Sequence, residues 1–365
     1  MTKGQPKLDK KDLRILLELE NNCRKTNKHI ARAARLSKEA VSYRINKLLN
    51  AKIIRGFSTI IDYQKLGLNV GTFLIKTRGL SNDNEMKFIE HLKEINYTSW
   101  IGKTMGRWDF LIAFMYKDTY DLNAALTKMM NAFSEKISEY KLLFDLDNYY
   151  FSGKVLFESL NSEVTPCTFS LGENKIGENK NPKIDSLDLK LLKTYSSDAR
   201  LSFLKASKKL NCSLNTVKYR LKTLEEKGII KSYSARINYN NLNFIWAICF
   251  FKLKNFSEDN KKPIISYLKQ RKNVTFVVNT VGEYVDCDVQ IKSSKDLEIF
   301  LKDVRNLFED NLVSIDTLNV TKVFKQNFLP IDIMLPKTNN CFLSGKNTNC
   351  STERTGRDSN PRPTA

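Results

Sequence analysis

Two stretches of the chain, residues 37–50 and 213–226, carry polar and basic side chains at helical spacing around a short apolar stripe. In the first stretch the stripe is Val41, Ile45 and Leu48, which recur at helical spacing and therefore face a core. The remaining surface offers groups that suit the base edges and phosphates of duplex DNA. The predicted contact residues are Ser37, Lys38, Glu39, Ser42, Tyr43, Arg44, Asn46 and Lys47, and in the second stretch Ser213, Asn215, Lys218, Tyr219, Arg220 and Lys222.

Arg44 and Arg220 occupy the same place in the two stretches, at the boundary between the apolar stripe and the polar face. A long arginine side chain there can lie over apolar surface while its guanidinium reaches a phosphate. The planar guanidinium suits an ion pair with a neighbouring helix equally well. The sequence leaves both roles open for these two arginines.

Both stretches belong to a duplicated segment. Residues 8–66 recur as residues 184–242 without a gap, at an offset of 176. Apolar and polar positions recur together, so we infer an internal repeat. Of the formal net charge of +20, residues 1–66 carry +10 and residues 180–242 carry +9. Basic residues confined to particular modules are typical of contact with a polyanion, and double-stranded DNA is the predicted partner.

Each repeated segment predicts three short helices with a tight turn. In the first copy Asp9 can cap a first helix that ends near Leu19, Thr26 or Asn27 can start a second, and Ser37 can cap a third. The run IIRGFSTIID alternates in polarity and predicts a strand leaving the module. Short helices in this order are typical of a helix-turn-helix, which the strand extends to a winged form.

After each module the pattern changes to strand, helix, two strands, helix and strand, which is the ferredoxin-like split βαβ. The elements are predicted at 71–77, 84–94, 98–101, 109–116, 120–134 and 138–146, and again at 246–253, 259–271, 274–278, 287–292, 295–309 and 314–321. The predicted fold class is therefore α+β, with two copies of a winged helix-turn-helix followed by a ferredoxin-like βαββαβ domain. The predicted boundaries are 1–66 and 183–242 for the helical domains, 67–159 and 243–335 for the ferredoxin-like domains, 160–182 for a flexible polar linker and 336–365 for a disordered tail.

The central hairpin of each ferredoxin-like domain carries a recurring motif, T-x-G-x-(aromatic)-D. The first copy has Thr104, Gly106, Trp108 and Asp109. The second has Thr280, Gly282 and Tyr284, but Val285 stands at the acidic position and Asp286 follows one residue late. The glycines and aromatics also suit a plain turn with a core side chain.

With this hairpin, the chain resembles the Lrp/AsnC (feast/famine) family of prokaryotic transcription regulators over residues 8–157 and again over residues 184–333. The resemblance implies a second domain that pairs chains and binds an amino acid or similar effector near the hairpin. The implied effector residues are Thr104, Gly106, Trp108, Asp109, Thr280, Gly282 and Tyr284. Two copies on one chain imply an intramolecular pseudo-dimer. Because members of the family usually pair through their second domains, the resemblance also implies further homo-oligomers. The missing acid at Val285 puts effector binding by the second copy in doubt.

An enzyme is the alternative, because the architecture also resembles that of sirohaem decarboxylases, some of which are fused duplicates. That branch carries a His- and Tyr-bearing segment where this chain has TSWIGKTMGRWDF, without histidine. His29 lies in the first helical module and His91 in a polar helix. The sequence also offers no nucleophile beside a base and no phosphate-cradling glycine loop, so no catalytic residue is predicted.

The composition also argues against several other kinds of protein. Seven cysteines form no CxxC pair, and the two histidines lack ligand spacing, so we predict neither a metal site nor a cofactor. The apolar run FIWAICFF is too short to span a bilayer, and the charged N-terminus does not resemble a targeting signal. The sequence therefore predicts a cytoplasmic protein.

Overall fold

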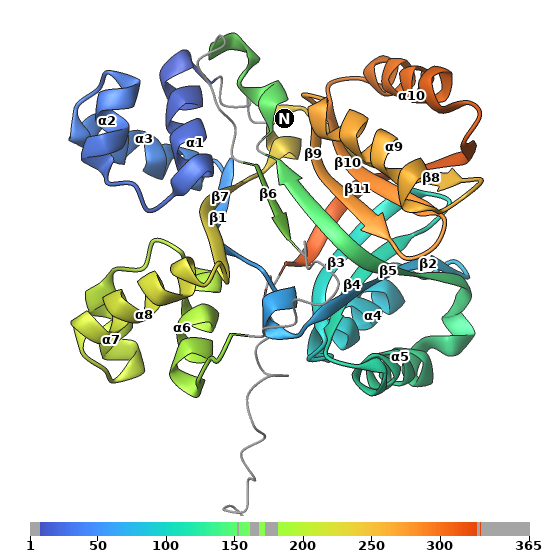
Figure 1. Ribbon diagram of the computed structural model, residues 1–365, viewed down its shortest axis with the longest axis horizontal. Helices are drawn as coiled ribbons and strands as arrows, with labels where there is room; N and C mark the ends of the chain where they lie inside the picture. Colours follow the sequence, from blue (N-terminus) through green and yellow to red (C-terminus); the bar gives the residue numbers. More distant parts are fainter. Residues whose placement is uncertain (1–7, 152, 161–167, 172–181, 327–328, 330–365) are drawn as a thin grey trace, which may run out of the picture. The chain divides into compact units, whose positions relative to one another are not determined.

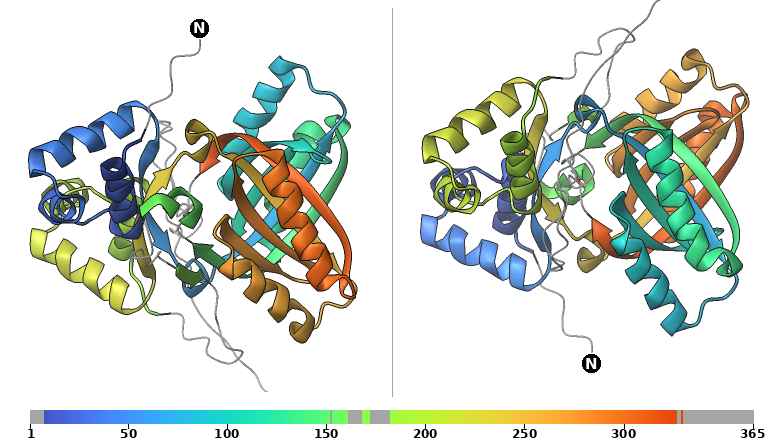
Figure 2. Two further views of the ribbon diagram at one scale, coloured as in Figure 1. Left: turned by 90° about the horizontal axis from the view of Figure 1, so that it is seen from above. Right: turned by 90° about the horizontal axis from the view of Figure 1, so that it is seen from below.

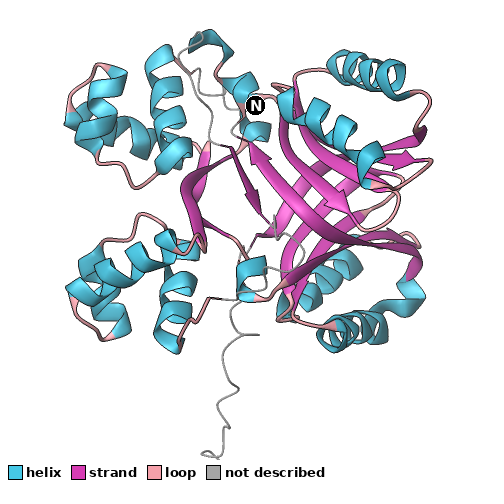
Figure 3. Cartoon of the chain, viewed as in Figure 1, coloured by secondary structure: helices cyan, strands magenta, loops and turns pink. Residues whose placement is uncertain are grey.

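The computed structural model describes residues 8–151, 153–160, 168–171, 182–326 and 329. The predicted tail, residues 336–365, lies outside the described residues. The described chain forms two helical heads, a two-stranded ribbon and one large antiparallel sheet that carries further helices (Figures 1 and 3). The predicted α+β class, with two helix-turn-helix regions each followed by a β-α-β-β-α-β unit, is confirmed.

The first head begins with three helices whose starts are set by side-chain caps. They are α1 (Lys10–Asn22), α2 (Asn27–Ala34) and α3 (Lys38–Asn50). Asp9 forms a capping box with Asp12, and the hydroxyls of Thr26 and Ser37 accept backbone N–H groups at the starts of α2 and α3. These are the predicted caps, although α1 runs three residues beyond its predicted end at Leu19.

The second head repeats this construction. Its helices are α6 (Ser186–Ser197), α7 (Phe203–Leu210) and α8 (Leu214–Glu226). Asp185 and Asp188 form the same capping box, and Ser213 caps α8. The buried stripe of α8, Val217 to Leu224, corresponds to Val41 to Leu48 on α3. The duplication read from the sequence is therefore a duplication of structure.

A two-stranded ribbon joins the heads. Strand β1 (Ile54–Ile61) pairs with β7 (Ile230–Ile237) in antiparallel register. Each head also docks onto the strand of the other: Cys23 N–H donates to the carbonyl of Tyr233 at 2.8 Å, and Ala199 N–H donates to the carbonyl of Phe57 at 3.1 Å. Helix α1 thus packs on β7 and helix α6 on β1, so residues of both heads share one hydrophobic core.

The two ferredoxin-like units supply the large sheet. The first consists of β2 (Asn69–Thr77), α4 (Asn82–Glu94), β3 (Thr98–Gly106), β4 (Phe110–Tyr116), α5 (Thr119–Phe133) and β5 (Ile137–Phe151). The second consists of β8 (Ile245–Leu253), α9 (Glu258–Gln270), β9 (Val274–Thr280), β10 (Tyr284–Ile291), α10 (Ser294–Phe308) and β11 (Leu312–Gln326). The helices pack on the outer face of each unit, over separate apolar cores (Figure 2).

Strands β5 and β11 merge the two units. The first half of β5 pairs with β2 of its own unit, and its second half pairs with β9 of the other. Strand β11 likewise pairs with β8 and then with β3. The strand order β2-β4-β3-β11-β8-β10-β9-β5, with β5 returning to β2, closes the sheet into a barrel. Both strands run five residues beyond their predicted ends, because the added length pairs with the other copy.

Part of the predicted linker is ordered structure. Thr168–Leu171 forms a short strand, β6, that pairs with residues 148–151 of β5. The Phe169 ring stacks on Tyr150 at 5.0 Å, and Leu171 is buried. Flexibility across all of residues 160–182 was therefore wrong for this segment, because its alternating side chains complete an apolar contact. Residues 161–167 and 172–181 lie outside the described part.

The buried hydroxyl of Thr59 allows a test of how much the docking of α6 onto β1 contributes to stability. Thr59 is fully buried and donates from Oγ1 to the carbonyl of Tyr195 at 2.7 Å. We expect Thr59→Val to lower the free energy of unfolding by about 1–3 kcal/mol, because the carbonyl loses its donor in a dry site. Chemical denaturation measures this change.

The matched control is Thr321→Val, which removes an exposed hydroxyl bonded to the carbonyl of Lys103 at 3.2 Å. It should shift stability by no more than about 0.5 kcal/mol. Equal losses at both positions would contradict a special role for the docking contact.

Candidate nucleic-acid interface and internal cavities

The polar face predicted for α3 is exposed. Its exposed side chains are those of Lys38, Glu39, Ser42, Tyr43, Asn46, Lys47 and Asn50. The Tyr43 side chain is 71% exposed, which is unusual for a large aromatic ring that could have packed inward. Its equivalent on α8, Tyr219, is also 71% exposed. Each helix therefore presents an aromatic hydroxyl to solvent at the same place.

Helix α8 exposes a different set of groups. Asn215, Lys218, Tyr219 and Lys222 are exposed, whereas their equivalents on α3 are Glu39, Ser42, Tyr43 and Asn46. The Lys222 ammonium lies 3.4 Å from Glu226, an exposed i,i+4 pair that costs little to separate. The second helix is thus more basic than the first on the face that the sequence predicts for DNA.

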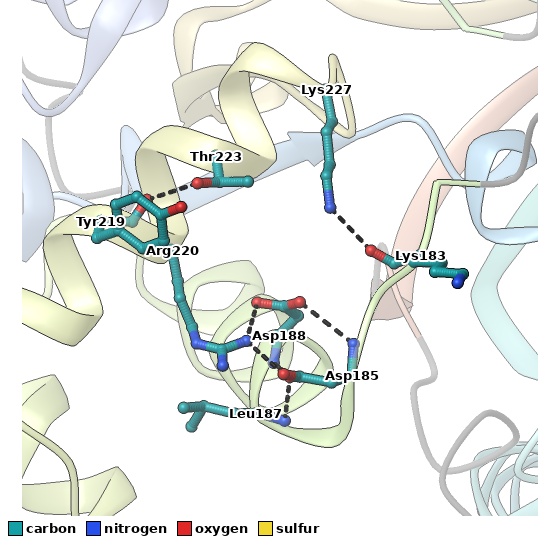
Figure 4. Close-up of polar contacts among 8 residues, drawn as sticks. All are labelled: Lys183, Asp185, Leu187, Asp188, Tyr219, Arg220, Thr223 and Lys227. Atoms are coloured by element: carbon teal, nitrogen blue, oxygen red, sulfur yellow. Dashed lines mark hydrogen bonds and ion pairs between the residues drawn. The ribbon is translucent and has the colours of Figure 1, made fainter.

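Arg44 and Arg220 form ion pairs within their own heads. In the first head Arg44 Nη1 lies 2.7 Å from a carboxylate oxygen of Asp9 and 2.7 Å from one of Asp12. In the second head Arg220 Nη1 lies 2.6 Å from Asp185 and 2.9 Å from Asp188, as Figure 4 shows. Each arginine thereby ties the third helix to the N-terminal capping box of the first helix. Of the two roles left open, this is the ion pair.

The second-head ion pair also affects ionisation. The backbone N–H of Asp188, and after it the guanidinium of Arg220, hold the pKa of the Asp185 carboxyl below its usual value. The hydrogen bonds that Arg220 donates to Asp188 and Asp185 raise the pKa of Arg220 in turn. The same figure shows Lys227 donating to the carbonyl of Lys183 at 2.8 Å, a further tie between α8 and the start of the head.

The first hairpin motif lies between β3 and β4. Thr104 Oγ1 donates to the carbonyl of Trp108 at 2.7 Å, and the Trp108 ring is buried. The Asp109 carboxylate accepts from the backbone N–H and hydroxyl of Thr77 at 2.7 and 2.8 Å. Gly106 has φ +143°, and a Cβ there would meet the carbonyl oxygen of Thr317 at 2.9 Å. The motif therefore mainly holds the hairpin in shape against its neighbouring strands.

The second motif keeps half of these contacts. Thr280 Oγ1 donates to the carbonyl of Tyr284 at 2.7 Å, while Gly282 turns the chain at φ +85°. Val285, at the acidic position, is buried in the apolar core. Trp108 and Tyr284 from the two copies meet in one cavity of about 170 Å³, where the Lys141 ammonium lies 3.6 Å from the Tyr284 ring centroid. The structure thus brings Trp108 and Tyr284 together in this cavity. Asp109 does not line it and instead binds Thr77.

A larger cavity, of about 320 Å³, lies between the ribbon and the barrel. Its walls are mostly apolar and include Trp100 and Trp246, whose rings meet edge to face at 6.0 Å. Four carboxyl groups line it: Glu20 on α1, Asp145 on β5, and Asp286 and Asp288 on β10. Glu20 is buried, whereas the three aspartates of the cavity wall keep part of their surface exposed.

Sequence reasoning missed this cavity. The run YVDCDVQI on β10 alternates, which is typical of a strand with one face in solvent. In the structure the polar face turns inward because β5 and β11 close the barrel over it. Burial raises the pKa of Asp145 and of Asp288 to about 7, and it raises the pKa of Asp286 well above its usual value.

Comparison with known proteins places these features in a family. Residues 8–49 match the model of the AsnC-type helix-turn-helix domain, and residues 184–231 match a winged helix-turn-helix DNA-binding model. An HTH-type transcriptional regulator of Pyrococcus furiosus is 30% identical over 148 residues, which are 40% of this chain and 97% of the relative. This chain belongs to the Lrp/AsnC family. The HTH-type transcriptional regulator Ptr1 of Methanocaldococcus jannaschii is 34% identical over 120 residues, or 32% of this chain and 79% of its own length.

One solved structure matches this chain over both copies of the repeat. The sirohaem decarboxylase NirDL superposes on 87% of this chain and 93% of its own with a TM-score of 0.56, at 14% sequence identity. At that identity the likeness shows the fold alone. Two helix-turn-helix regions and two ferredoxin-like domains therefore occur together in that fold.

Two absences apply to the described part of the chain. No group of three or more His, Cys, Asp or Glu side chains there is placed to hold a metal ion. Among the same residues, no helix is long and apolar enough to cross a membrane.

The Arg220 ion pairs should contribute modestly to stability. Arg220→Gln leaves Asp188 nearly buried without its cationic partner, whereas Asp185 is 54% exposed and is well hydrated. We therefore expect the free energy of unfolding to fall by about 1–2 kcal/mol, as urea denaturation would measure. The control, Lys190→Gln on the exposed face of α6, makes the same charge change and should have little effect. Equal effects would rule out the ion pair as the cause.

The cavity carboxyls should give stability an unusual pH dependence. Because the pKa of Asp288 is raised from 3.8 to about 7, the folded chain holds a proton that the unfolded chain releases. Stability should therefore fall as pH rises from about 4 to about 7. Asp288→Asn should remove up to about 1.4 kcal/mol of this fall per pH unit. Urea denaturation across that window measures the slope, with the exposed Asp310→Asn as control; an unchanged slope in Asp288→Asn would contradict the assignment.

Proposed function

We propose that this chain is a sequence-specific DNA-binding transcription regulator that places α3 and α8 in the major grooves of two half-sites. The observation that carries the proposal is the pair of capped, exposed third helices within segments that hold +19 of the +20 net charge. The regulators in Pyrococcus furiosus and Methanocaldococcus jannaschii support it by sequence. Such a protein would act in the cytoplasm.

Base contacts are assigned to the side chains that stay free of internal packing. Tyr43 and Asn46 on α3, and Tyr219 on α8, can present hydrogen-bonding groups to base edges. Phosphate contacts are assigned to exposed lysines such as Lys38 and Lys47, with the N-cap residues Ser37 and Ser213 beside them. Arg44 and Arg220 support these helices from behind through their ion pairs.

The two heads should prefer different half-sites. Glu39, Ser42 and Asn46 on α3 correspond to Asn215, Lys218 and Lys222 on α8. An acid accepts from cytosine and a lysine donates to guanine, so these exchanges change the bases that each helix favours. We therefore expect an asymmetric operator, in contrast to the palindrome that two identical heads would select.

Effector binding remains part of the proposal. The small cavity between Trp108 and Tyr284 supports it, because aromatic walls and the nearby Lys141 and Glu139 could hold the carboxylate and ammonium of an amino acid. Thr104 and Thr280 would act indirectly, by holding the two hairpins in shape. We also propose that the pseudo-dimer assembles into larger homo-oligomers, because members of the family usually pair through their second domains.

A second candidate is a sirohaem decarboxylase-like enzyme. It is favoured by the superposition on NirDL and by the cavity with its four carboxyl groups. Loss of CO2 from a carboxylate side chain leaves a carbon that must take up a proton, and a carboxyl with a pKa near 7 such as Asp288 could supply it. The charge on the heads has no role in this alternative.

The test is binding of the full chain to the DNA upstream of its own gene, compared with a scrambled duplex of equal length. We expect fluorescence anisotropy to show sequence preference and an affinity that falls steeply with salt. Tyr43→Ala and Lys222→Ala should each change the preference by about 1–3 kcal/mol at the bases they contact. Lys190→Gln, on the exposed face of α6, should leave preference unchanged.

The same preparation distinguishes the enzyme. Salt-insensitive binding without sequence preference would refute the regulator. A stoichiometric shift of the absorption spectrum of an added iron tetrapyrrole, lost in Asp288→Asn, would then support the second candidate. Selection of perfect palindromes by the chain would refute different half-sites while leaving the regulator intact.

A further inference from the structure

Arg24 and Arg200 are equivalent positions in the two heads, 176 residues apart, yet their surroundings differ. The Arg24 guanidinium lies over three aromatic rings, 5.0 Å from the centroid of Tyr195, 4.7 Å from that of Phe203 and 5.2 Å from that of Tyr233. Its Nη1 donates to the carbonyl of Ala199 at 2.7 Å. On the Arg24 side of the junction between the heads, these aromatic rings therefore fill the space around the guanidinium; we call this the filled side.

Arg200 lacks most of this enclosure. The positions equivalent to Tyr195 and Phe203 hold Leu19 and Asn27, so only the ring of Phe57 remains, at 5.2 Å. Arg200 Nη2 donates to Asn27 Oδ1 at 3.0 Å, but Nη1 is buried without a hydrogen-bond partner. The space left by the smaller side chains is an open pocket of about 490 Å³.

Two more arginines line this pocket, Arg55 on β1 and Arg236 on β7. Their equivalents on the filled side are Lys231 and Ile60, and the Lys231 ammonium lies 3.3 Å from the Asp62 carboxylate. The concentration of guanidinium groups is thus confined to one side. We call the space lined by Arg55, Arg200, Arg236, Asp198, Ser42 and Asn46 the interhead pocket.

Arg236 is accommodated by a glycine. Gly56 stands opposite it in the ribbon, and a Cβ at Gly56 would lie 2.6 Å from Arg236 Nη2. Arg236 Nε is buried without a hydrogen-bond partner, although a buried guanidinium normally has each N–H satisfied. The glycine therefore makes room for a cation whose Nε has no hydrogen-bond partner within the described chain.

The charges of the interhead pocket are not balanced. None of the three arginines makes an ion pair with a carboxylate of the described residues. Burial, and then the charge of Arg236, lower the pKa of Arg55. Asp198 is the acidic residue of the lining, and its charge offsets part of the burial effect on Arg200. An anion in this space would relieve both the repulsion and the unmet donors.

We propose that the interhead pocket binds the phosphate group of a free small molecule. Planar guanidiniums match phosphate oxygens in bidentate geometry, and the side chains of Arg55, Arg200 and Arg236 line the pocket together. Ser42 and Asn46, which line the pocket, are also exposed residues of α3. The bound phosphate therefore lies against the first recognition helix and changes DNA binding by the first head.

The experiment is calorimetric titration of the full chain with pyrophosphate at constant ionic strength. The wild-type chain binds one equivalent saturably. Arg200→Gln and Arg236→Gln each weaken binding by about tenfold or more, which corresponds to one lost charged hydrogen bond. Lys190→Gln, with the same charge change on the exposed face of α6, binds as the wild type does.

Thermal unfolding without ligand separates binding from a structural role. Arg236→Gln removes a buried, repelled charge, so its midpoint should equal or exceed that of the wild type. A lower midpoint would identify Arg236 as a structural residue and overturn the proposal. Absence of saturable binding, or equal weakening in Lys190→Gln, overturns it as well.

A DNA titration identifies the source of the phosphate. If pyrophosphate does not bind, and Arg236→Gln lowers the slope of log affinity against log salt by about one, the arginines contact the DNA backbone and the free ligand is excluded. Pyrophosphate binding in a chain that fails to bind DNA would uphold the pocket and refute the regulator. The two proposals therefore fail independently.

Discussion

Pairing of β1 with β7 is the interaction on which the rest of this structure depends. Each strand begins a few residues after a third helix, so the antiparallel register of the ribbon fixes how the two heads face each other. The first helix of each head then docks on the strand of the other, and residues of both heads share one core. Neither head could complete that core alone. Covalent fusion favours this pairing because the second copy is always present at high effective concentration.

The two copies have kept their scaffold and diverged at their surfaces. The ion pairs of Arg44 and Arg220 with their capping boxes are nearly identical, which explains why Asp9, Asp12 and the arginine recur together. The exposed faces of α3 and α8 differ, and the junction around Arg24 and Arg200 differs further. A homodimer presents the same surface twice, whereas a fused chain can give each half its own contacts. Asymmetry is therefore the property that fusion makes available to this fold.

Closure of the barrel has a cost that the sequence alone does not reveal. It turns Asp286 and Asp288 inward, where burial raises the pKa of both carboxyls. Such groups destabilise a fold when they ionise. The small cavity at Trp108 and Tyr284 and the larger cavity beside the ribbon are both formed from the two copies together. Ligand binding at either one would therefore report on the pairing of the halves.

The sequence by itself determined what depends on neighbours along the chain. Helix caps at Asp9 and Ser37, the buried stripe of α3 and the order of strands and helices follow from local hydrogen bonding and periodicity. Only the tertiary structure decided what depends on contacts between residues far apart in the sequence. The full length of β5 and β11, the choice of an ion pair for Arg44, the inward face of β10 and the arginines of the interhead pocket all arise there. The physical reason is that strand pairing and charge pairing join residues far apart in sequence, and no local pattern records the partner.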